Sequence, residues 1–280
     1  MKILITGANG MLAKAVRNEM KKEELICTDV NELDITNLEA VREFVKTNKP
    51  QYIINCAAYT AVDKAEEQVE LARKINAIGP KNLAITANEN DCTLIHISTD
   101  YVFGGDKPIN YVYNEDDEKA PNSVYGITKL EGEQNIISSC FKYYIFRTAW
   151  LYGDGNNFVR TMLKLGKEKE SVNVVCDQHG SPTYSVDLAG IIHEAIKKEI
   201  PYGVYHTTNQ GFTSWDEFTK LIFKKAGINC KVNSVTSEEF PSTAKRPLNS
   251  QLSKEKILNC KINIPTYEDA LDRYLSVEKY

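Results

Sequence analysis

Five short apolar runs divide the first 150 residues into repeating units. They are continuous rather than alternating, and rich in β-branched and aromatic residues, as in parallel strands buried on both faces. We predict strands at Lys2–Thr6, Leu25–Asp29, Gln51–Cys56, Thr93–Ile97 and Tyr143–Arg147. Between them, helical periodicity predicts helices at Met11–Lys21, Leu38–Thr47, Val62–Asn88 and Ser123–Ser139. This alternation predicts an α/β fold with a doubly wound parallel sheet and right-handed crossovers.

The pattern becomes less regular after Trp150. Further elements are predicted as strands at Val172–Cys176 and Val204–Thr207, and as helices at Val186–Lys197 and Trp215–Ala226. Three prolines then punctuate a tail with little periodicity: Pro241, Pro247 and Pro265. We expect residues 1–150 to form a large first domain, which strands and helices near residues 172–210 join. Residues 151–280 should form mainly a smaller α/β region that binds substrate.

Composition and charge narrow the class of protein. With 42% hydrophobic and 26% charged residues, the 280-residue chain should bury a large core. The net charge of −4 argues against nucleic acid or an anionic membrane as the main partner. The seven cysteines contain no C-x-x-C pair and the four histidines no metal-ligand spacing, so we expect free thiols and no metal site. Without a signal peptide or an apolar run long enough to span a membrane, we expect a soluble, cytoplasmic protein.

The first predicted strand runs into the sequence Gly7-Ala8-Asn9-Gly10-Met11-Leu12-Ala13, spaced G-x-x-G-x-x-A. Gly7 permits a tight turn, Gly10 lets backbone N–H groups approach a pyrophosphate, and Ala13 lets the helix pack close to the strand. The pattern alone also suits an ordinary glycine turn. Its position between a strand and a helix favours a Rossmann-type NAD(P)-binding domain within residues 1–150.

A carboxylate ends the second predicted strand about twenty residues later. Asp29 is placed to accept hydrogen bonds from the adenosine ribose, although a turn aspartate is an alternative. No arginine follows it to neutralise a 2′-phosphate, which favours NADH; NADPH stays an alternative because Arg17 or a lysine could reach that group. Asp34 and Ile35 come next, and Asp34 either contacts the adenine or caps a helix.

The residues for chemistry lie further along. Tyr125 and Lys129 are four residues apart, so both side chains face one side of a helix that Ser123 can cap. A free tyrosine has a pKa of about 10, and a neighbouring ammonium should lower it toward the range useful for proton transfer. The same ammonium can hold the nicotinamide ribose. A surface helix with an unrelated Tyr and Lys is the alternative interpretation.

A hydroxyl at the end of the fourth predicted strand supports the catalytic interpretation. Thr99 follows Ile97-Ser98, and the carboxyl end of that strand faces the ligand crevice of such a sheet. Its hydroxyl can hydrogen-bond a substrate carbonyl. Thr99, Tyr125 and Lys129 then form a carbonyl-reducing triad, with the hydride supplied by a nicotinamide.

The chain resembles the extended short-chain dehydrogenase/reductase family, because the glycine fingerprint, the strand-end threonine and the Y-x-x-x-K pattern follow in this order. Five further segments narrow the resemblance to the dTDP-4-dehydrorhamnose reductase family within it. These segments are residues 55–66 (NCAAYTAVDKAE), 98–103 (STDYVF), 147–150 (RTAW), 177–183 (DQHGSPT) and 245–250 (KRPLNS). They span nearly the whole chain.

The resemblance implies a role for particular residues. Its cofactor contacts are Gly10, Met11 and Leu12 at the phosphates and Ala58, Tyr59 and Thr60 at the nicotinamide half. Its substrate contacts are Thr99, Asp100 and Trp150, with Tyr125 as the proton donor, and with Asn157, Gln178 and Arg246 in the nucleotide-sugar pocket. The guanidinium of Arg246 would pair with the diphosphate, unless it is an ordinary surface arginine.

The implied activity is reduction of the C4 ketone of a dTDP-linked 4-dehydro sugar, the last step of dTDP-L-rhamnose biosynthesis for cell-surface polysaccharide. Some relatives bind magnesium at a dimer interface through a glutamate just after the fingerprint; Ala13-Lys14-Ala15 supply no carboxylate, so that metal is not expected and a homodimer stays open. Nucleotide-sugar 4,6-dehydratases need an Asp-Glu pair after the threonine, where this chain has Asp100-Tyr101. Another nucleotide-sugar reductase or epimerase, or a non-catalytic subunit resembling the regulatory subunit of methionine adenosyltransferase, remains an alternative.

Overall fold

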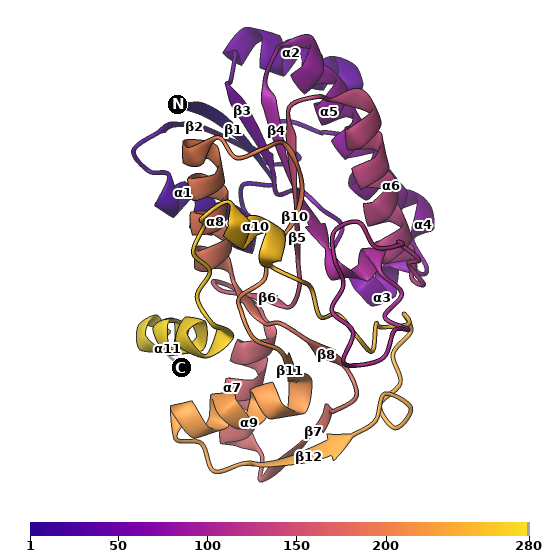
Figure 1. Cartoon of the computed structure of the whole chain (residues 1–280), viewed down its shortest axis with the longest axis vertical. Helices are drawn as coiled ribbons and strands as arrows, with labels where there is room; N and C mark the ends of the chain where they lie inside the picture. The colour runs from indigo at the N-terminus through magenta and orange to yellow at the C-terminus, as the bar shows by residue number, and fades with distance from the viewer. Residues whose placement is uncertain (279–280) are drawn as a thin grey trace.

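A computed structural model describes residues 1–278 and shows a six-stranded sheet in the order β10-β5-β4-β3-β1-β2 (Figure 1). All neighbouring strands in it are parallel. The strands are β1 (Lys2–Thr6), β2 (Glu24–Thr28), β3 (Tyr52–Asn55), β4 (Thr93–Thr99), β5 (Tyr143–Thr148) and β10 (Gly203–His206). The prediction of a doubly wound α/β fold is confirmed. β4 continues two residues beyond the predicted end, because its ladder with β5 reaches the pair Thr99 and Thr148.

Helices cover both faces of this sheet. On one face, Ile3 and Ile5 of β1 pack with α1 (Met11–Glu19) and α8 (Ser185–Lys198). On the other face, Leu4 packs in a second cluster with α2 (Leu38–Asn48), α5 (Gly79–Glu89) and α6 (Val124–Ser139). Because successive side chains of a strand point to opposite faces, one continuous apolar run supplies both clusters.

The predicted single helix at 62–88 is wrong, because the chain is interrupted there. The observed elements are α3 (Val62–Ala65), α4 (Val69–Arg73), the π-helical turn η1 (Lys74–Ile78) and α5. Pro80 has no N–H to donate, and the N–H of Gly79 bonds to the carbonyl of Lys74, five residues back. The π turn presents Asn76, whose side chain makes two hydrogen bonds to the backbone of Tyr59 (2.8 and 3.1 Å).

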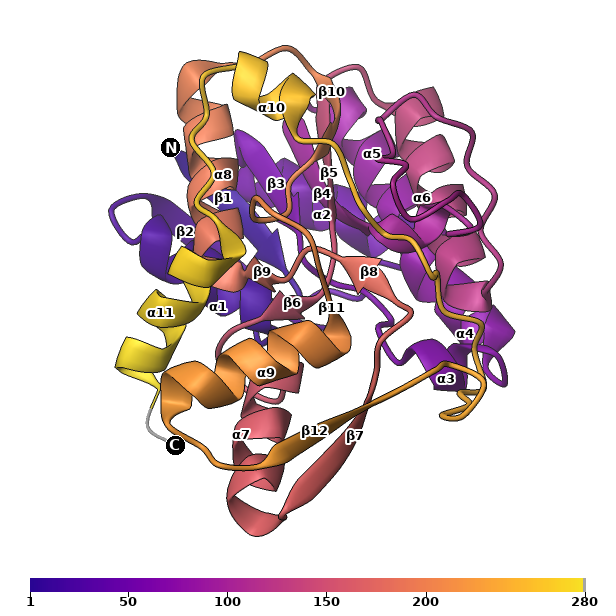
Figure 2. The ribbon, with the colours of Figure 1, turned by 60° about the horizontal axis from the view of Figure 1, so that its bottom comes forward.

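The second region lies beneath the carboxyl ends of the sheet strands (Figure 2). It contains α7 (Phe158–Glu168), β7 (Ser171–Val175), α9 (Trp215–Ala226), β12 (Lys231–Val235) and α11 (Tyr267–Val277). The strand predicted at 172–176 is present as β7, but it pairs with β12 rather than with the large sheet. β12 has the sequence KVNSV, which is too polar to be read as a buried strand. β10, in contrast, extends the large sheet beside β5. The division into two domains near residue 150 stays a prediction.

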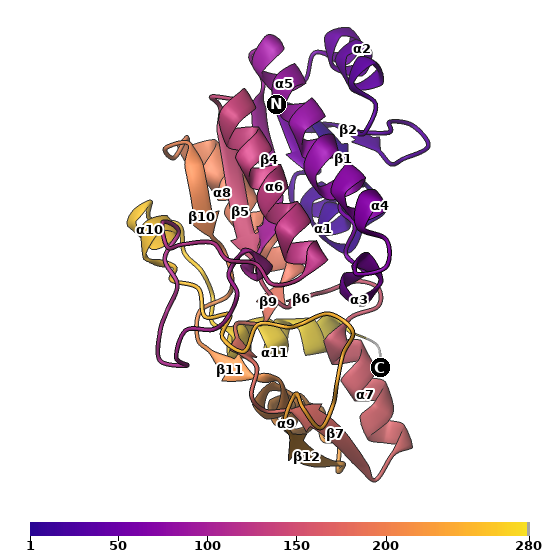
Figure 3. The same cartoon turned by 90° about the vertical axis from the view of Figure 1, so that its right-hand side faces the viewer.

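The remaining short elements are η2 (Asp100–Val102), β6 (Leu151–Tyr152), β8 (His179–Gly180), β9 (Thr183–Tyr184), β11 (Thr213–Ser214) and α10 (Glu255–Asn259). β6 and β9 lie where the two regions meet (Figure 3), whereas α10 packs beside β10 of the large sheet. β6 pairs with β9 and β8 with β11, so the chain after β5 is tied to the second region within a few residues. None of the helices in residues 1–278 combines the length and the apolar character needed to cross a membrane.

Candidate active site

The glycine fingerprint forms a close turn between β1 and α1. Gly7 has φ +64°, and a Cβ added there would lie 2.7 Å from the backbone N and Cα of Ala57. A side chain at this position is therefore excluded both by conformation and by space. Gly10 precedes α1 in extended conformation, and a Cβ there would meet only the Gly7 carbonyl oxygen, at 3.2 Å. The start of α1 is thus open to an anion.

Two cavities run along the carboxyl ends of the strands from this turn. One, of about 280 Å³, is lined by residues that include Gly7, Asp29, Asp34 and Ile35. The other, of about 460 Å³, is lined by residues that include Met11, Leu12, Thr60, Thr99, Tyr125, Lys129 and Trp150. Gly10, Cys56 and Ala58 line both, so the two cavities form one trough. The glycine turn and the carboxylate of Asp29 in its lining fit a nicotinamide dinucleotide.

Local hydrogen bonds hold the adenosine end in shape. The Asp29 carboxylate accepts from the backbone N–H groups of Asn9 (3.2 Å) and Val30 (2.8 Å). The Glu32 carboxylate accepts from the N–H of Asp29 (2.8 Å), which brings a second negative charge beside the first. The Asp34 carboxylate accepts from the N–H and the hydroxyl of Thr36 (2.9 and 2.6 Å), and the bond from the hydroxyl lowers the pKa of this carboxyl. The cap of α2 is Asn37, so Asp34 does not cap that helix.

Of the three residues predicted to contact the nicotinamide half, Tyr59 does not line the trough. Its phenol donates to the Gln68 side chain (2.9 Å), and its backbone is held by Asn76. Ala58 and Thr60 on either side line the trough.

Tyr125 and Lys129 lie on one side of α6, which Ser123 caps by accepting from the N–H of Gly126 (3.2 Å). Lys129 is 1% exposed, and its Nζ donates to the Ile97 carbonyl (2.6 Å) and lies 3.2 Å from His96 Nε2. Burial lowers the pKa of Lys129 to about 8. The expected lowering of the Tyr125 pKa by Lys129 is wrong, because burial raises it, and the phenol is protonated at neutral pH.

Thr99 and Asp100 complete the chemical end of the trough. The Thr99 hydroxyl donates to Asp100 Oδ1 (2.9 Å), and its contact with Tyr125 partly offsets the effect of burial on the pKa of that phenol. Asp100 also accepts from the Ser250 hydroxyl (2.6 Å), and burial raises the pKa of its carboxyl to about 6. The structure therefore brings Thr99, Asp100 and Tyr125 together.

A buried carboxylate behind the triad was missed in the sequence. Glu133 lies four residues after Lys129 on the same side of α6 and is 1% exposed. It accepts from Arg147 Nε (2.9 Å) and Nη2 (2.7 Å) and from the Ser98 hydroxyl (2.5 Å). Its negative charge raises the pKa of Lys129 against the effect of burial. The i, i+4 spacing of Tyr125, Lys129 and Glu133 is the signal that could have found it.

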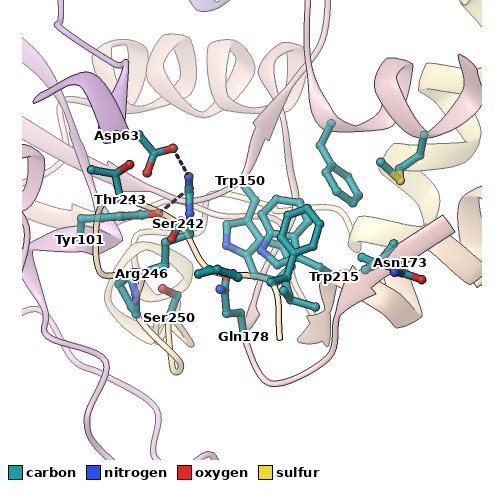
Figure 4. A pocket seen from close by; sticks show the side chains of 17 residues that line it. Asp63, Tyr101, Trp150, Asn173, Gln178, Trp215, Ser242, Thr243, Arg246 and Ser250 are labelled. Atoms are coloured by element: carbon teal, nitrogen blue, oxygen red, sulfur yellow. Dashed lines mark hydrogen bonds and ion pairs between the residues drawn. The ribbon is translucent and has the colours of Figure 1, made fainter. Parts of the chain in front are cut away.

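A third cavity, of about 640 Å³, opens between the trough and the second region (Figure 4). Trp150, Gln178 and Arg246 of the predicted substrate contacts line it. Trp150 has φ +49°, a strained conformation for a bulky residue, and its ring stacks on Trp215 with centroids 3.7 Å apart. Such strain is characteristic of ligand sites.

Other residues of this cavity were not predicted: Asp63, Tyr101, Phe158, Trp215 and Ser250 are examples. Asn157, which was predicted, does not line it. Its side chain caps α7 by accepting from Arg160 N (3.0 Å) and donates to the Gly153 carbonyl (2.7 Å). No helix was predicted at residues 158–168, so the capping role of this asparagine was missed.

The position after the fingerprint carries a cation. Lys14 pairs with Asp154 (3.0 Å), and within residues 1–278 no group of three or more His, Cys, Asp or Glu side chains is arranged to hold a metal ion.

Comparison with known proteins agrees with this geometry. The family model described as the RmlD substrate binding domain matches residues 1–279. The chain is 40% identical over 293 residues to dTDP-4-dehydrorhamnose reductase of Escherichia coli K12, with 99% of this chain and 97% of that protein covered.

Two crystal structures are also similar over almost the entire chain. A dTDP-4-dehydrorhamnose reductase from Clostridium acetobutylicum has 49% identity and a TM-score of 0.95, with 99% of each chain covered. The same enzyme from Bacillus anthracis, solved in complex with NADP, has 43% identity and a TM-score of 0.94, covering 99% of this chain and 100% of that one. With its fingerprint, its Thr-Tyr-Lys arrangement and these full-length matches, the chain belongs to the dTDP-4-dehydrorhamnose reductase family.

Proposed function

We propose that this protein reduces the C4 ketone of dTDP-4-dehydro-β-L-rhamnose to the alcohol of dTDP-L-rhamnose, with NAD(P)H as reductant. The observation that carries the proposal is that Thr99 and Tyr125 line the trough beside Tyr101, which also lines the 640 Å³ cavity. Trp150 and Tyr101 line both spaces, so a ligand in each would meet at these side chains.

The residues divide the reaction between them. When bound, the nicotinamide supplies the hydride that the carbonyl carbon accepts. The Thr99 hydroxyl orients the carbonyl oxygen, and the Tyr125 phenol gives its proton to the oxygen as negative charge develops there. A phenol whose pKa is raised by burial is protonated and ready to donate. The Lys129 ammonium would hold the cofactor ribose, and its positive charge would stabilise the phenolate that the proton transfer leaves behind.

The buried lysine predicts how activity depends on pH. We expect kcat/KM to fall as the pH rises through about 8, where the ammonium of Lys129 loses its proton. The groups that face its Nζ are His96, the Ile97 carbonyl, Cys56 and Glu133. Since the pKa of Tyr125 is raised, the phenol stays protonated through this range and does not account for the fall.

Steady-state rates between pH 6 and 10 measure this fall in kcat/KM, whose midpoint gives the pKa of the group in the free enzyme. Lys129→Arg is the matched control: a guanidinium stays charged, so the fall in kcat/KM should shift to higher pH. A flat profile between pH 7 and 9 would contradict the assignment.

The adenosine end predicts the cofactor preference. We expect NADH to bind at least as tightly as NADPH, because Asp29 and Glu32 place two carboxylates where a 2′-phosphate would lie. Asp29→Ala should shift the ratio of the two dissociation constants toward NADPH. Fluorescence titration of both cofactors measures it. A strong NADPH preference of the native protein would refute the expectation and point to Arg17, whose guanidinium donates to the Ala8 carbonyl (3.5 Å).

The function is tested directly by mixing the purified protein with enzymatically made dTDP-4-dehydro-β-L-rhamnose and either cofactor, with and without magnesium. We expect cofactor oxidation and a product identified by NMR as dTDP-L-rhamnose. If neither cofactor is oxidised under any of these conditions, the reductase function fails, and a non-catalytic binding subunit becomes the better interpretation.

A further inference from the structure

The loop between β12 and α10 forms one wall of the 640 Å³ cavity. Its residues 240–247 contribute Phe240, Pro241, Ser242, Thr243, Arg246 and Pro247 to the lining. This stretch contains no helix or strand. Something outside the loop must therefore hold its cavity-facing side chains in place.

The ends of the loop are held through Ser237 and Ser250, which bond to Asp177 and Asp100. Asp63 anchors the stretch between them, and it uses both carboxylate oxygens. Oδ2 pairs with Arg246 Nη2 (2.7 Å), and Oδ1 accepts from the backbone N–H of Ala244 (3.0 Å), as Figure 4 shows for the arginine. Arg246 Nη1 also donates weakly to the Tyr101 hydroxyl (3.4 Å). Within the described part of the chain, the hydrogen bonds from residues 240–247 to elements outside this loop go to Asp63 and Tyr101.

The anchor belongs to the cofactor side of the molecule. Asp63 lies in α3, directly after Ala58, Thr60 and Val62, which line the trough. Just beyond α3, Glu66 accepts from the N–H of Val124 (2.9 Å), the residue before Tyr125. One short helix thus contacts the cofactor trough, the start of the catalytic helix and the wall of the neighbouring cavity.

We propose that Asp63 is a positioning residue that couples the two sites: it holds Arg246 and its loop in the cavity, so that cofactor binding in the trough strengthens binding of a nucleoside diphosphate there. The proposal rests on the proposed function for the ligand of the cavity. A cofactor in the trough would contact Ala58, Thr60 and Val62 and so restrain the start of α3, which presents Asp63 to the loop. The guanidinium then faces the diphosphate already oriented, with one carboxylate as its partner.

The ion pair is suited to this task because it is accessible. The side chains of Arg246 and Asp63 are 32% and 44% exposed, and exposed pairs contribute little to the stability of a fold. Asp63→Ala should therefore leave the protein folded.

The test is calorimetric titration of dTDP into the full-length protein, with and without saturating NADH. Coupling between two sites is typically about 5–150-fold, so we expect NADH to tighten dTDP binding at least about fivefold in the native protein. In Asp63→Ala this factor should approach one. Asp63→Asn keeps an acceptor for Ala244 but loses the charge, and should lie between them. By reciprocity, dTDP must tighten NADH binding by the same factor.

Steady-state kinetics supply a second readout. Asp63→Ala should raise the KM of the sugar nucleotide while kcat changes little, because Asp63 touches no reacting atom. Asp272→Ala is the matched control: it removes an exposed ion pair with Lys225 (2.6 Å) and lines none of the described cavities. It should leave both the coupling factor and KM unchanged.

The outcomes separate this inference from the function. Suppose that the native protein oxidises cofactor and binds dTDP. If NADH then does not tighten dTDP binding, or tightens it equally in Asp63→Ala, the coupling role is wrong and the function stands. If the native protein binds no dTDP at all, the function and the coupling role fall together.

Discussion

Replacing Tyr125 with phenylalanine should lower turnover by about 10²–10⁴-fold, the usual contribution of a general acid, while cofactor affinity stays nearly unchanged. The ring fills the same buried space beside Tyr101, whose centroid lies 5.4 Å away in an edge-to-face contact, so the packing is preserved. What disappears is the proton for the developing alkoxide. Single-turnover hydride transfer measured beside NADH titration separates the two effects.

Thr99→Val is the companion variant for this experiment. The hydroxyl of Thr99 donates to Asp100 and would orient a carbonyl rather than supply the proton. Losing this hydroxyl should therefore reduce the rate less than losing the phenol of Tyr125. Near-native hydride transfer in Tyr125→Phe would mean that another acid protonates the sugar. Asp100, whose carboxyl pKa is raised to about 6, would be the first candidate.

The cofactor half could be predicted from the sequence because its signals are local. A continuous apolar strand, a glycine turn and a carboxylate twenty residues later lie close together in the chain, and the parallel sheet brings their ends to one edge. The single predicted helix at 62–88 failed for a local and a nonlocal reason. Pro80, which lacks an N–H, follows directly after the π turn at Lys74–Ile78. From elsewhere in the chain, α6 approaches so closely that a Cβ at Gly132 would lie 2.2 Å from the Asn76 carbonyl oxygen.

The substrate cavity could be predicted only in part. Trp150, Gln178 and Arg246 were found through segments that resemble a family, not through spacing. Asp63, Tyr101 and Trp215 come from α3, η2 and α9, elements far apart in the chain that only the tertiary fold brings to one cavity. β12, which precedes the loop in the cavity wall, has too little apolar character to be recognised. The direction of Lys129 likewise depends on where the Ile97 carbonyl lies, which helical spacing alone does not determine.

The buried ion pair behind the triad should matter for both stability and chemistry. Glu133 and Arg147 are 1% and 2% exposed, and the guanidinium also donates to the Glu115 carbonyl (3.1 Å). Breaking such a pair on one side leaves a charge without a partner in a site that water does not reach. We therefore expect Glu133→Gln to lower the free energy of unfolding by about 3–5 kcal/mol, as measured by urea denaturation.

Glu131→Gln is the matched control, since it makes the same substitution two residues earlier on α6. Glu131 pairs with Arg73 at 2.9 Å, but these side chains are 34% and 39% exposed, so the loss should be at most about 1 kcal/mol. A double variant, Glu133→Leu with Arg147→Met, removes both charges and should recover most of the stability lost in Glu133→Gln. Equal losses in Glu131→Gln and Glu133→Gln would show that burial does not govern the strength of this pair.

The same variant tests how the pair acts on the lysine. The charge of Glu133 raises the pKa of Lys129 against the lowering effect of burial, which leaves that pKa at about 8. Without the charge the pKa must fall further, so the fall in kcat/KM of Glu133→Gln should begin at a lower pH than in the native protein. The double variant lacks the same carboxylate and should show the same shift to lower pH, although its stability is restored. If the double variant shows the native pH dependence of kcat/KM, Glu133 acts on folding alone. If its fall in kcat/KM stays at the lower pH, Glu133 acts by raising the pKa of Lys129.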